Sequence, residues 1–186
     1  MTQCNMPAVE FPSIKNKRII ADFSAGAISS DAGLLLLRQA DRRLGLLKHA
    51  AQCIRDPRNQ DMIEHKIETM LRQRVFGIGC GYEDLNDHQE LRKDALMKMA
   101  SNMLAEGQDL ASAPTLCRLE KRVQRQELAD ISRILVETFI KSYKKAPKEL
   151  ILDFDATDIA LHGNHEGRFF HGYYDQYCYL PLYVFC

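Results

Sequence analysis

The sequence predicts a mainly α-helical region over most of the chain, followed by a strand-rich C-terminal segment. Three observations support this. Apolar residues between positions 34 and 145 recur at three- and four-residue spacing, the period of amphipathic helices. At position 149 the pattern changes to short apolar runs. Residues 168–186 then hold eight of the fifteen aromatic residues, a density that favours strands.

The first third of the chain is expected to form one strand and two helices. After a loose, proline-containing start, residues 18–23 have the composition of a short strand. Residues 29–32 favour the start of a helix, which we expect to run from Gly33 to Gly45. Gly45 should separate it from a second helix, which ends at Asp56-Pro57 because proline disfavours a continuing helix.

The middle of the chain also has helical periodicity. Apolar residues between positions 63 and 75 share one helical face, with Arg72 and Arg74 off the middle of that stripe. Residues 77–81 lack the Gly-Lys-Ser/Thr ending of a phosphate loop, and no strand precedes them, so we interpret them as a flexible helix end. We then expect a short polar helix or turn at 82–92, a helical stripe at 91–103, a loop at 106–114, a basic helix at 115–122 and a long helix at 123–145.

Composition and charge limit the classes of function. The chain has 186 residues, 46% hydrophobic and 27% charged, as in a folded protein of one domain or two small ones. Lys plus Arg equals Asp plus Glu, but residues 151–186 hold five acids and one base, Arg168. The chain is thus weakly basic before residue 151 and acidic after it. Such a difference is typical of solvated charge, and it also fits a cation site beside an anion-binding surface. The absence of a secretory signal, of Cys-x-x-Cys pairs and of long apolar runs predicts a cytoplasmic protein with no membrane partner.

Residues 149–155 carry the most informative pattern, a short apolar run with acids at its end. This is typical of a buried central strand. Alternation would put Asp153 and Asp155 on one side of that strand, where two carboxylates repel unless they share a proton or a divalent cation. Oxygen ligands suit Mg²⁺ or Mn²⁺ better than zinc. The acids could also cap the following turn or pair with Lys or Arg.

Two classes of enzyme use such a strand. In haloacid-dehalogenase-like phosphatases the strand ends in Asp-x-Asp-x-Thr, which Asp153, Asp155 and Thr157 match. That class needs a lysine on a later strand, and no lysine follows Asp155.

The second class is the DDE transposases, and here the resemblance extends over several segments from about residue 17 to the end. Residues 30–38 (SDAGLLLLR), 71–76 (LRQRVF), 81–88 (GYEDLNDH), 114–120 (PTLCRLE), 152–158 (LDFDATD) and 171–182 (HGYYDQYCYLPL) resemble insertion-sequence transposases of this type. The resemblance implies an RNase-H-like catalytic domain that cleaves DNA and transfers strands with two Mg²⁺ or Mn²⁺ ions. Asp155, followed by Ala-Thr, matches the first catalytic acid and metal ligand, with Asp153 as the fallback ligand.

The same resemblance divides the chain into two parts. Residues 1–147 would be a helical N-terminal region that recognises transposon ends, and residues 148–186 the start of the catalytic domain. The family's second Asp and its Glu lie far downstream of the first acid, so we expect a truncated fragment that binds metal weakly and does not cleave DNA. The arginines expected to contact DNA phosphates are Arg72, Arg74, Arg118, Arg122 and Arg125.

Three points stay open at this stage. A competing function is that of a non-catalytic DNA-binding decoy or regulator derived from a transposase. The sequence also leaves open whether the protein forms a homo-oligomer. His162, His165 and His171 with Cys178 match no known zinc spacing, and we expect them to be structural.

Overall fold

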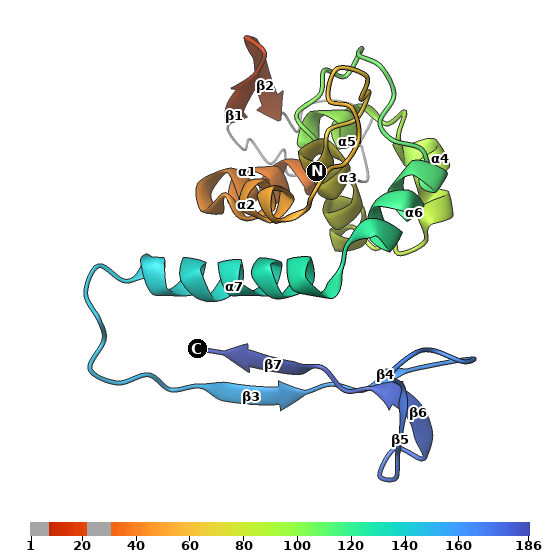
Figure 1. The fold of residues 1–186 in the computed structure, drawn as a ribbon. Helices are drawn as coiled ribbons and strands as arrows, with labels where there is room; N and C mark the ends of the chain where they lie inside the picture. Colours follow the sequence, from red (N-terminus) through yellow and green to blue (C-terminus); the bar gives the residue numbers. More distant parts are fainter. Residues whose placement is uncertain (1–7, 22–30) are drawn as a thin grey trace, which may run out of the picture. The chain divides into compact units, whose positions relative to one another are not determined.

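The computed structural model describes residues 8–21 and 31–186, which fold as two compact units. We call them the helical unit, which ends at Ser142, and the strand unit, Tyr143–Cys186. Helices dominate the first and small antiparallel sheets make up the second (Figure 1), so the protein is a mixed α and β structure. Within the described residues, no helix is both long and apolar enough to cross a membrane.

A β-hairpin opens the described part of the helical unit. Its strands, β1 (Val9–Ile14) and β2 (Lys17–Ala21), pair antiparallel. The expectation of a loose start is therefore wrong for residues 9–14, because Phe11 and Ile14 are buried against Leu35. The predicted strand at 18–23 is confirmed as far as Ala21. Residues 22 and 23, and positions 29 and 30 of the predicted helix start, lie outside the described residues.

The rest of the helical unit consists of helices joined by short connections. Those described are α1 (Leu34–Leu44), α2 (Leu46–Cys53), α3 (Ile67–Gly79), the 3₁₀ helix η1 (Leu85–Asp87), α4 (His88–Leu91), α5 (Ala95–Ala100), α6 (Ala113–Arg122) and α7 (Arg125–Ser142). As predicted, Gly45 separates α1 from α2. Its φ of 69° is left-handed, a conformation that glycine adopts without steric cost.

The helix end predicted at residues 77–81 is confirmed, because α3 runs through Gly77 and ends at Gly79. One predicted boundary is wrong. The predicted loop at 106–114 ends at Ser112, because α6 begins at Ala113 with Pro114 in its first turn. Proline is tolerated there since the first backbone N–H groups of a helix have no partner within the helix.

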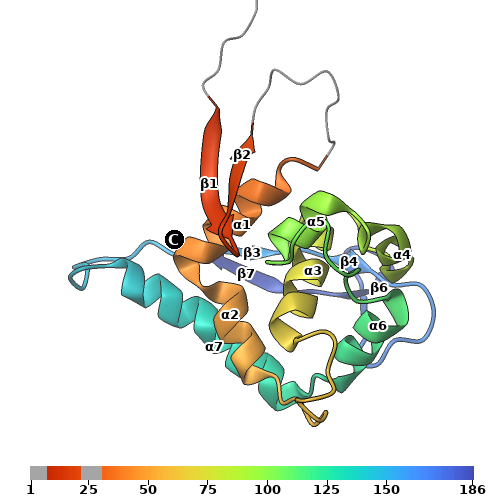
Figure 2. The same cartoon turned by 90° about the horizontal axis from the view of Figure 1, so that it is seen from above.

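Two clusters of buried apolar side chains hold these helices together. One includes Leu34 of α1, Phe76 of α3 and Met97 of α5. The other includes Met70 of α3 and Leu116 of α6. Helix α3 therefore contributes to both clusters, and it packs against both α5 and α6 (Figure 2).

The strand unit contains two small antiparallel sheets. Strand β3 (Asp153–Ala156) pairs with β7 (Leu182–Phe185). In the second sheet β6 (Gln176–Tyr179) lies between β4 (Ile159–Ala160) and β5 (Phe169–His171). The aromatic segment thus forms strands, as predicted, and Cys178 is fully buried among them.

The prediction of a buried central strand over residues 149–155 is wrong. The strand begins at Asp153, so the acids lie at its start and middle instead of its carboxyl end. All four residues of β3 are exposed. The physical reason is that β3 belongs to a two-stranded ribbon, which does not by itself cover either face of its strands.

Candidate functional site

Asp153 and Asp155 lie on the same face of β3, as the alternation predicts. They are opposite Phe185 and Tyr183 of β7 in the antiparallel register. Both are exposed. Within the described residues neither carboxylate has a hydrogen-bond or ion-pair partner, so neither caps a turn nor binds a base there. The fold therefore does not use the charge of this acid pair.

The next acid, Asp158, has a structural partner. Its Oδ2 accepts a hydrogen bond of 2.7 Å from Nε2 of Gln176 on β6. The backbone N–H of Thr157 donates to the carbonyl of Pro181 at 3.2 Å, which extends the pairing of β3 with β7 by one residue. These bonds fix the direction in which the chain leaves β3. Asp158 therefore has a structural role, which Asp153 and Asp155 do not share.

The acid pair has the chemistry of a partial divalent-cation site. Carboxylate oxygens are preferred by Mg²⁺, which commonly keeps several waters and binds one or two protein carboxylates. In the part of the chain that the structure describes, no group of three or more His, Cys, Asp or Glu side chains gathers as a metal site. The described residues thus bring together two carboxylates on one face of β3, and a complete cation site would need further oxygen ligands.

The histidines of the strand unit pack against aromatic and backbone groups. The His171 ring lies 4.8 Å from the Tyr174 ring and 5.9 Å from that of Phe169, measured between centroids. Nε2 of His165 lies 3.1 Å from the His162 carbonyl.

In the helical unit, three of the six segments that resemble transposases meet around α3. Arg74 donates from Nε to Glu120 at 2.6 Å and from Nη2 to the Glu83 carbonyl at 2.8 Å. Gln73 lies next to His88, with its Nε2 3.4 Å from Nδ1 of the ring. The segments at 71–76, 81–88 and 114–120 are therefore joined by direct side-chain contacts and build the fold.

The five arginines predicted to contact DNA fall into two groups. Arg72 is buried and bound to Asp41, at 3.1 Å, and to Glu68. Arg74 is held as described, and Arg122 lies 3.2 Å from Asp56. Arg118 and Arg125 are exposed. Arg118 makes one bond to its neighbour Thr115 at 3.0 Å, and its charge faces solvent.

Asp56, the partner of Arg122, is a strongly paired carboxylate. Hydrogen bonding from the Arg58 side chain lowers the pKa of Asp56 to about 2. Both Nε and Nη2 of Arg58 donate to it at 2.7 Å. Arg58 already balances the charge of Asp56. Arg122, which also contacts Asp56, therefore keeps part of its positive charge available to a ligand.

Sequence reasoning missed Lys121, which is exposed on α6 between Arg118 and Arg125. The three bases follow one another across the end of α6 and the start of α7. The signal in the sequence was the three-residue spacing of Arg118 and Lys121, which places these two bases on one side of α6.

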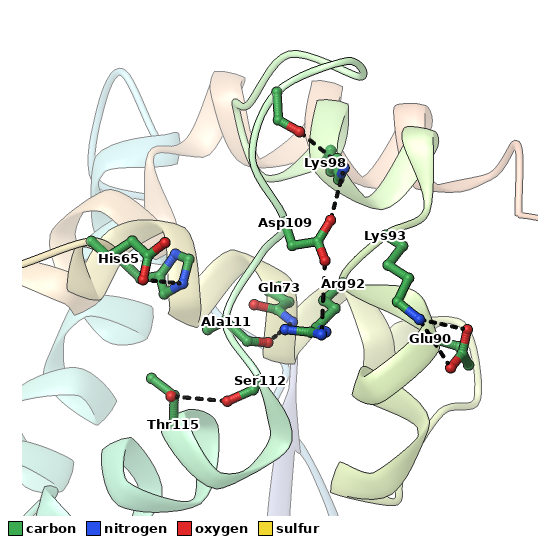
Figure 3. Close-up of polar contacts among 12 residues, drawn as sticks. His65, Gln73, Glu90, Arg92, Lys93, Lys98, Asp109, Ala111, Ser112 and Thr115 are labelled. Carbon is green, nitrogen blue, oxygen red and sulfur yellow. Dashed lines mark hydrogen bonds and ion pairs between the residues drawn. The ribbon is translucent and has the colours of Figure 1, made fainter.

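The loop before α6 is fixed by buried side chains of α3 and α5, Gln73 and Lys98 (Figure 3). The Lys98 side chain is buried, and its Nζ lies 3.1 Å from the Gly107 carbonyl and 3.3 Å from Oδ1 of Asp109. Gln73 donates to the Ala111 carbonyl at 2.8 Å. These bonds hold the N-terminal end of α6 in a defined position. They therefore also position the helix that carries the exposed bases Arg118 and Lys121.

Comparison with protein-family models matches residues 11–186 to the model described as transposase DDE domain group 1. The match extends through both units. Searches of curated proteins and of solved structures found no match.

Proposed function

Because this chain belongs to the transposase DDE domain family, group 1, we propose that it takes part in DNA cleavage and strand transfer during transposition. The observation that carries the proposal is the acid pair: Asp153 and Asp155 share one face of β3, and we propose that this strand carries the family's first catalytic acid. Both remain available for a ligand because the fold gives them no partner among the described residues.

The proposed role of Asp155 is that of the first metal ligand, with Asp153 as the second oxygen donor. DDE transposase domains generally use divalent metal ions. When bound, such an ion stabilises the charge that develops at a phosphate under in-line attack. The chain's own contribution is to hold two carboxylates on one face, with Tyr183 opposite Asp155 on β7. We further propose that β3 and β7 are the first strands of an RNase-H-like sheet.

The proposed role of the helical unit is to bind DNA through the bases at the junction of α6 and α7. Arg118, Lys121 and Arg125 are exposed there, and Arg122 is partly available. Arginine and lysine contacts to phosphates fix the position of a protein on DNA without reading its sequence. Arg72 and Arg74 have an indirect role in DNA binding, because their bonds to Asp41 and Glu120 hold α3 against α1 and α6.

The DNA-binding part is tested by fluorescence anisotropy with a labelled duplex at several salt concentrations. The Arg118→Gln/Arg125→Gln variant should bind less tightly, and its dependence of log affinity on log salt should fall by about 2, one for each lost phosphate contact. Lys93→Gln removes an exposed base elsewhere, on the segment between α4 and α5, and serves as the control. Equal binding by all three proteins would contradict the proposed surface.

The metal-binding part is tested by titration with Mn²⁺, followed by electron paramagnetic resonance of the free ion. Asp155→Asn should weaken binding by about tenfold or more, because one of two charged ligands is lost. Asp175→Asn removes an exposed carboxylate from the turn between β5 and β6 and should bind as the wild type does. DNA binding without metal-dependent nicking would favour a regulatory DNA-binding role. Hydrolysis of a small phosphate ester that Asp153→Asn abolishes would instead favour a phosphatase.

A further inference from the structure

A groove opens in the helical unit between the turn that joins α1 to α2 and the C-terminal half of α7. Its volume is about 450 Å³. Polar side chains line much of it: Arg43 from the end of α1, His49 and Gln52 from α2, and Thr138, Lys141 and Ser142 from α7. Helix α2 packs along α7 (Figure 2), so both walls are helical.

The groove has an excess of basic side chains. The charged side chains that line it are the bases Arg43 and Lys141 and the acid Glu137, whereas Arg42 and Lys48 are exposed on α1 and α2 but do not line it. The acid of these two helices, Asp41, is buried and bound to Arg72. On α7, Lys141 lies 3.2 Å from Glu137, which also lines the groove. The result is a basic groove in which one carboxylate partly neutralises one lysine.

Buried contacts fix the backbone of the turn that lies between Arg43 and His49. The Gly45 N–H donates to the Asp41 carbonyl at 2.6 Å, and Oδ1 of Asp41 accepts from the Leu47 N–H at 2.8 Å. A Cβ atom at Gly45 would lie 3.1 Å from Cε1 of His49, so the imidazole packs closely under the turn. Because Arg43 and His49 stand on a fixed turn, less conformational entropy is lost when a ligand binds them.

The opposite wall is fixed at the start of α7. Glu127 accepts hydrogen bonds of 2.7 Å from the backbone N–H groups of Gln124 and of Arg55. The first of these caps α7, and the second connects α7 to the segment that follows α2. These bonds lower the pKa of Glu127, in that order of importance. The spacing between the two walls is thus set by the fold before any ligand binds.

We propose that this groove binds a backbone phosphate of DNA and forms a contact separate from the bases on α6. The inference rests on the proposed transposase function. Arg43 and Lys141 supply charge and N–H donors, and Thr138 supplies a hydroxyl, which together suit a phosphodiester; the Ser142 hydroxyl already donates to the Phe139 carbonyl at 2.7 Å. Lys141 exchanges Glu137 for the phosphate when DNA binds. Glu137 therefore weakens DNA binding at this place.

The test measures anisotropy of a labelled duplex between roughly 50 and 200 mM salt, where phosphate contacts have a large effect. Arg43→Gln/Lys141→Gln should weaken binding about tenfold and lower the salt slope by about 2. Glu137→Gln should bind more tightly than the wild type, because the competing carboxylate is gone. Lys93→Gln, an exposed base paired with Glu90, is the control and should be unchanged.

Each remaining outcome decides between the claims. Unchanged affinity and slope in Lys141→Gln, whose side chain is 75% exposed and whose loss leaves the fold intact, would overturn the groove contact. Failure of Glu137→Gln to tighten binding would overturn the proposed exchange. If Arg118→Gln/Arg125→Gln weakens binding while the groove variants do not, the proposed function stands and the groove inference fails. If the wild type binds no duplex at all, the proposed function itself fails.

Discussion

Gly77 shows how one residue inside a helix can be required for packing. A Cβ atom at this position would lie 2.8 Å from Cε1 of His88, closer than atoms normally approach. The His88 ring is fully buried, so it has little room to move.

We predict that Gly77→Ala destabilises the protein although alanine favours helices. The helical preference of alanine would contribute about 1 kcal/mol, whereas overpacking a core commonly costs about 1–3 kcal/mol. Urea unfolding should show a net loss of stability. Gly33→Ala, where the added Cβ meets nothing within 4 Å, is the control and should be neutral or stabilising. A stabilised Gly77→Ala would contradict this packing.

His88 also predicts how stability depends on pH. Burial, followed by the charge of Arg74, lowers the pKa of His88. The unfolded chain therefore takes up a proton first as the pH falls, and folding stability should decrease below about pH 6.5, by up to about 1.4 kcal/mol per pH unit. Urea unfolding at pH 7.5 and at pH 5.5 measures the difference.

One variant separates His88 from other groups. His88→Gln should reduce the loss of stability on acidification relative to the wild type. Burial lowers the pKa of His65 as well, so the dependence should be reduced and not abolished. An unchanged dependence in His88→Gln would show that His88 is not the titrating group.

At the scale of elements, the buried pair of Arg72 and Asp41 joins α3 to the end of α1. Their side chains are 8% and 5% exposed. Removing one partner of such a pair leaves a buried charge without its counterion and costs about 3–5 kcal/mol. We predict a loss of this size for Arg72→Met in urea unfolding. Arg18→Gln, in a pair whose side chains are 72% and 61% exposed, should cost less than about 1 kcal/mol.

The elements that local patterns predicted well are the amphipathic helices. Gly45 marked the boundary between α1 and α2 because its conformation is a local property of glycine. The strand β1 was missed because Pro12 suggested a loop. Proline is tolerated where a strand is irregular, and the register here shifts between Phe11 and Ile14. Residues 77–81 were correctly expected to end a helix, but the contact of Gly77 with His88 was not predicted, because it forms only in the folded chain.

The acid pair shows the same limit for the candidate site. Alternation correctly predicted that Asp153 and Asp155 share a face, because this depends on the strand alone. Their burial was predicted incorrectly, because burial depends on which strands pair and what covers them. Likewise, the sequence identified Arg72 as a base off the apolar stripe, but its partner Asp41 is 31 residues away.

At the scale of the whole molecule, the family match covers residues from both units. The contacts of Arg74, Gln73 and His88 show that much of the resemblance in the helical unit reflects its fold. The acid pair differs, because the fold does not use it. This contrast is the reason for assigning chemistry to β3 and DNA binding to exposed bases of the helical unit.

The most direct test of this account is the position of a bound metal ion, measured by nuclear magnetic resonance as the loss of amide signals on addition of a small amount of Mn²⁺. We expect the signals lost first to surround Asp155 on β3 and Tyr183 on β7, and we expect Asp155→Asn to retain them. Signal loss centred on Glu166 or Asp175, and unchanged in Asp155→Asn, would contradict it.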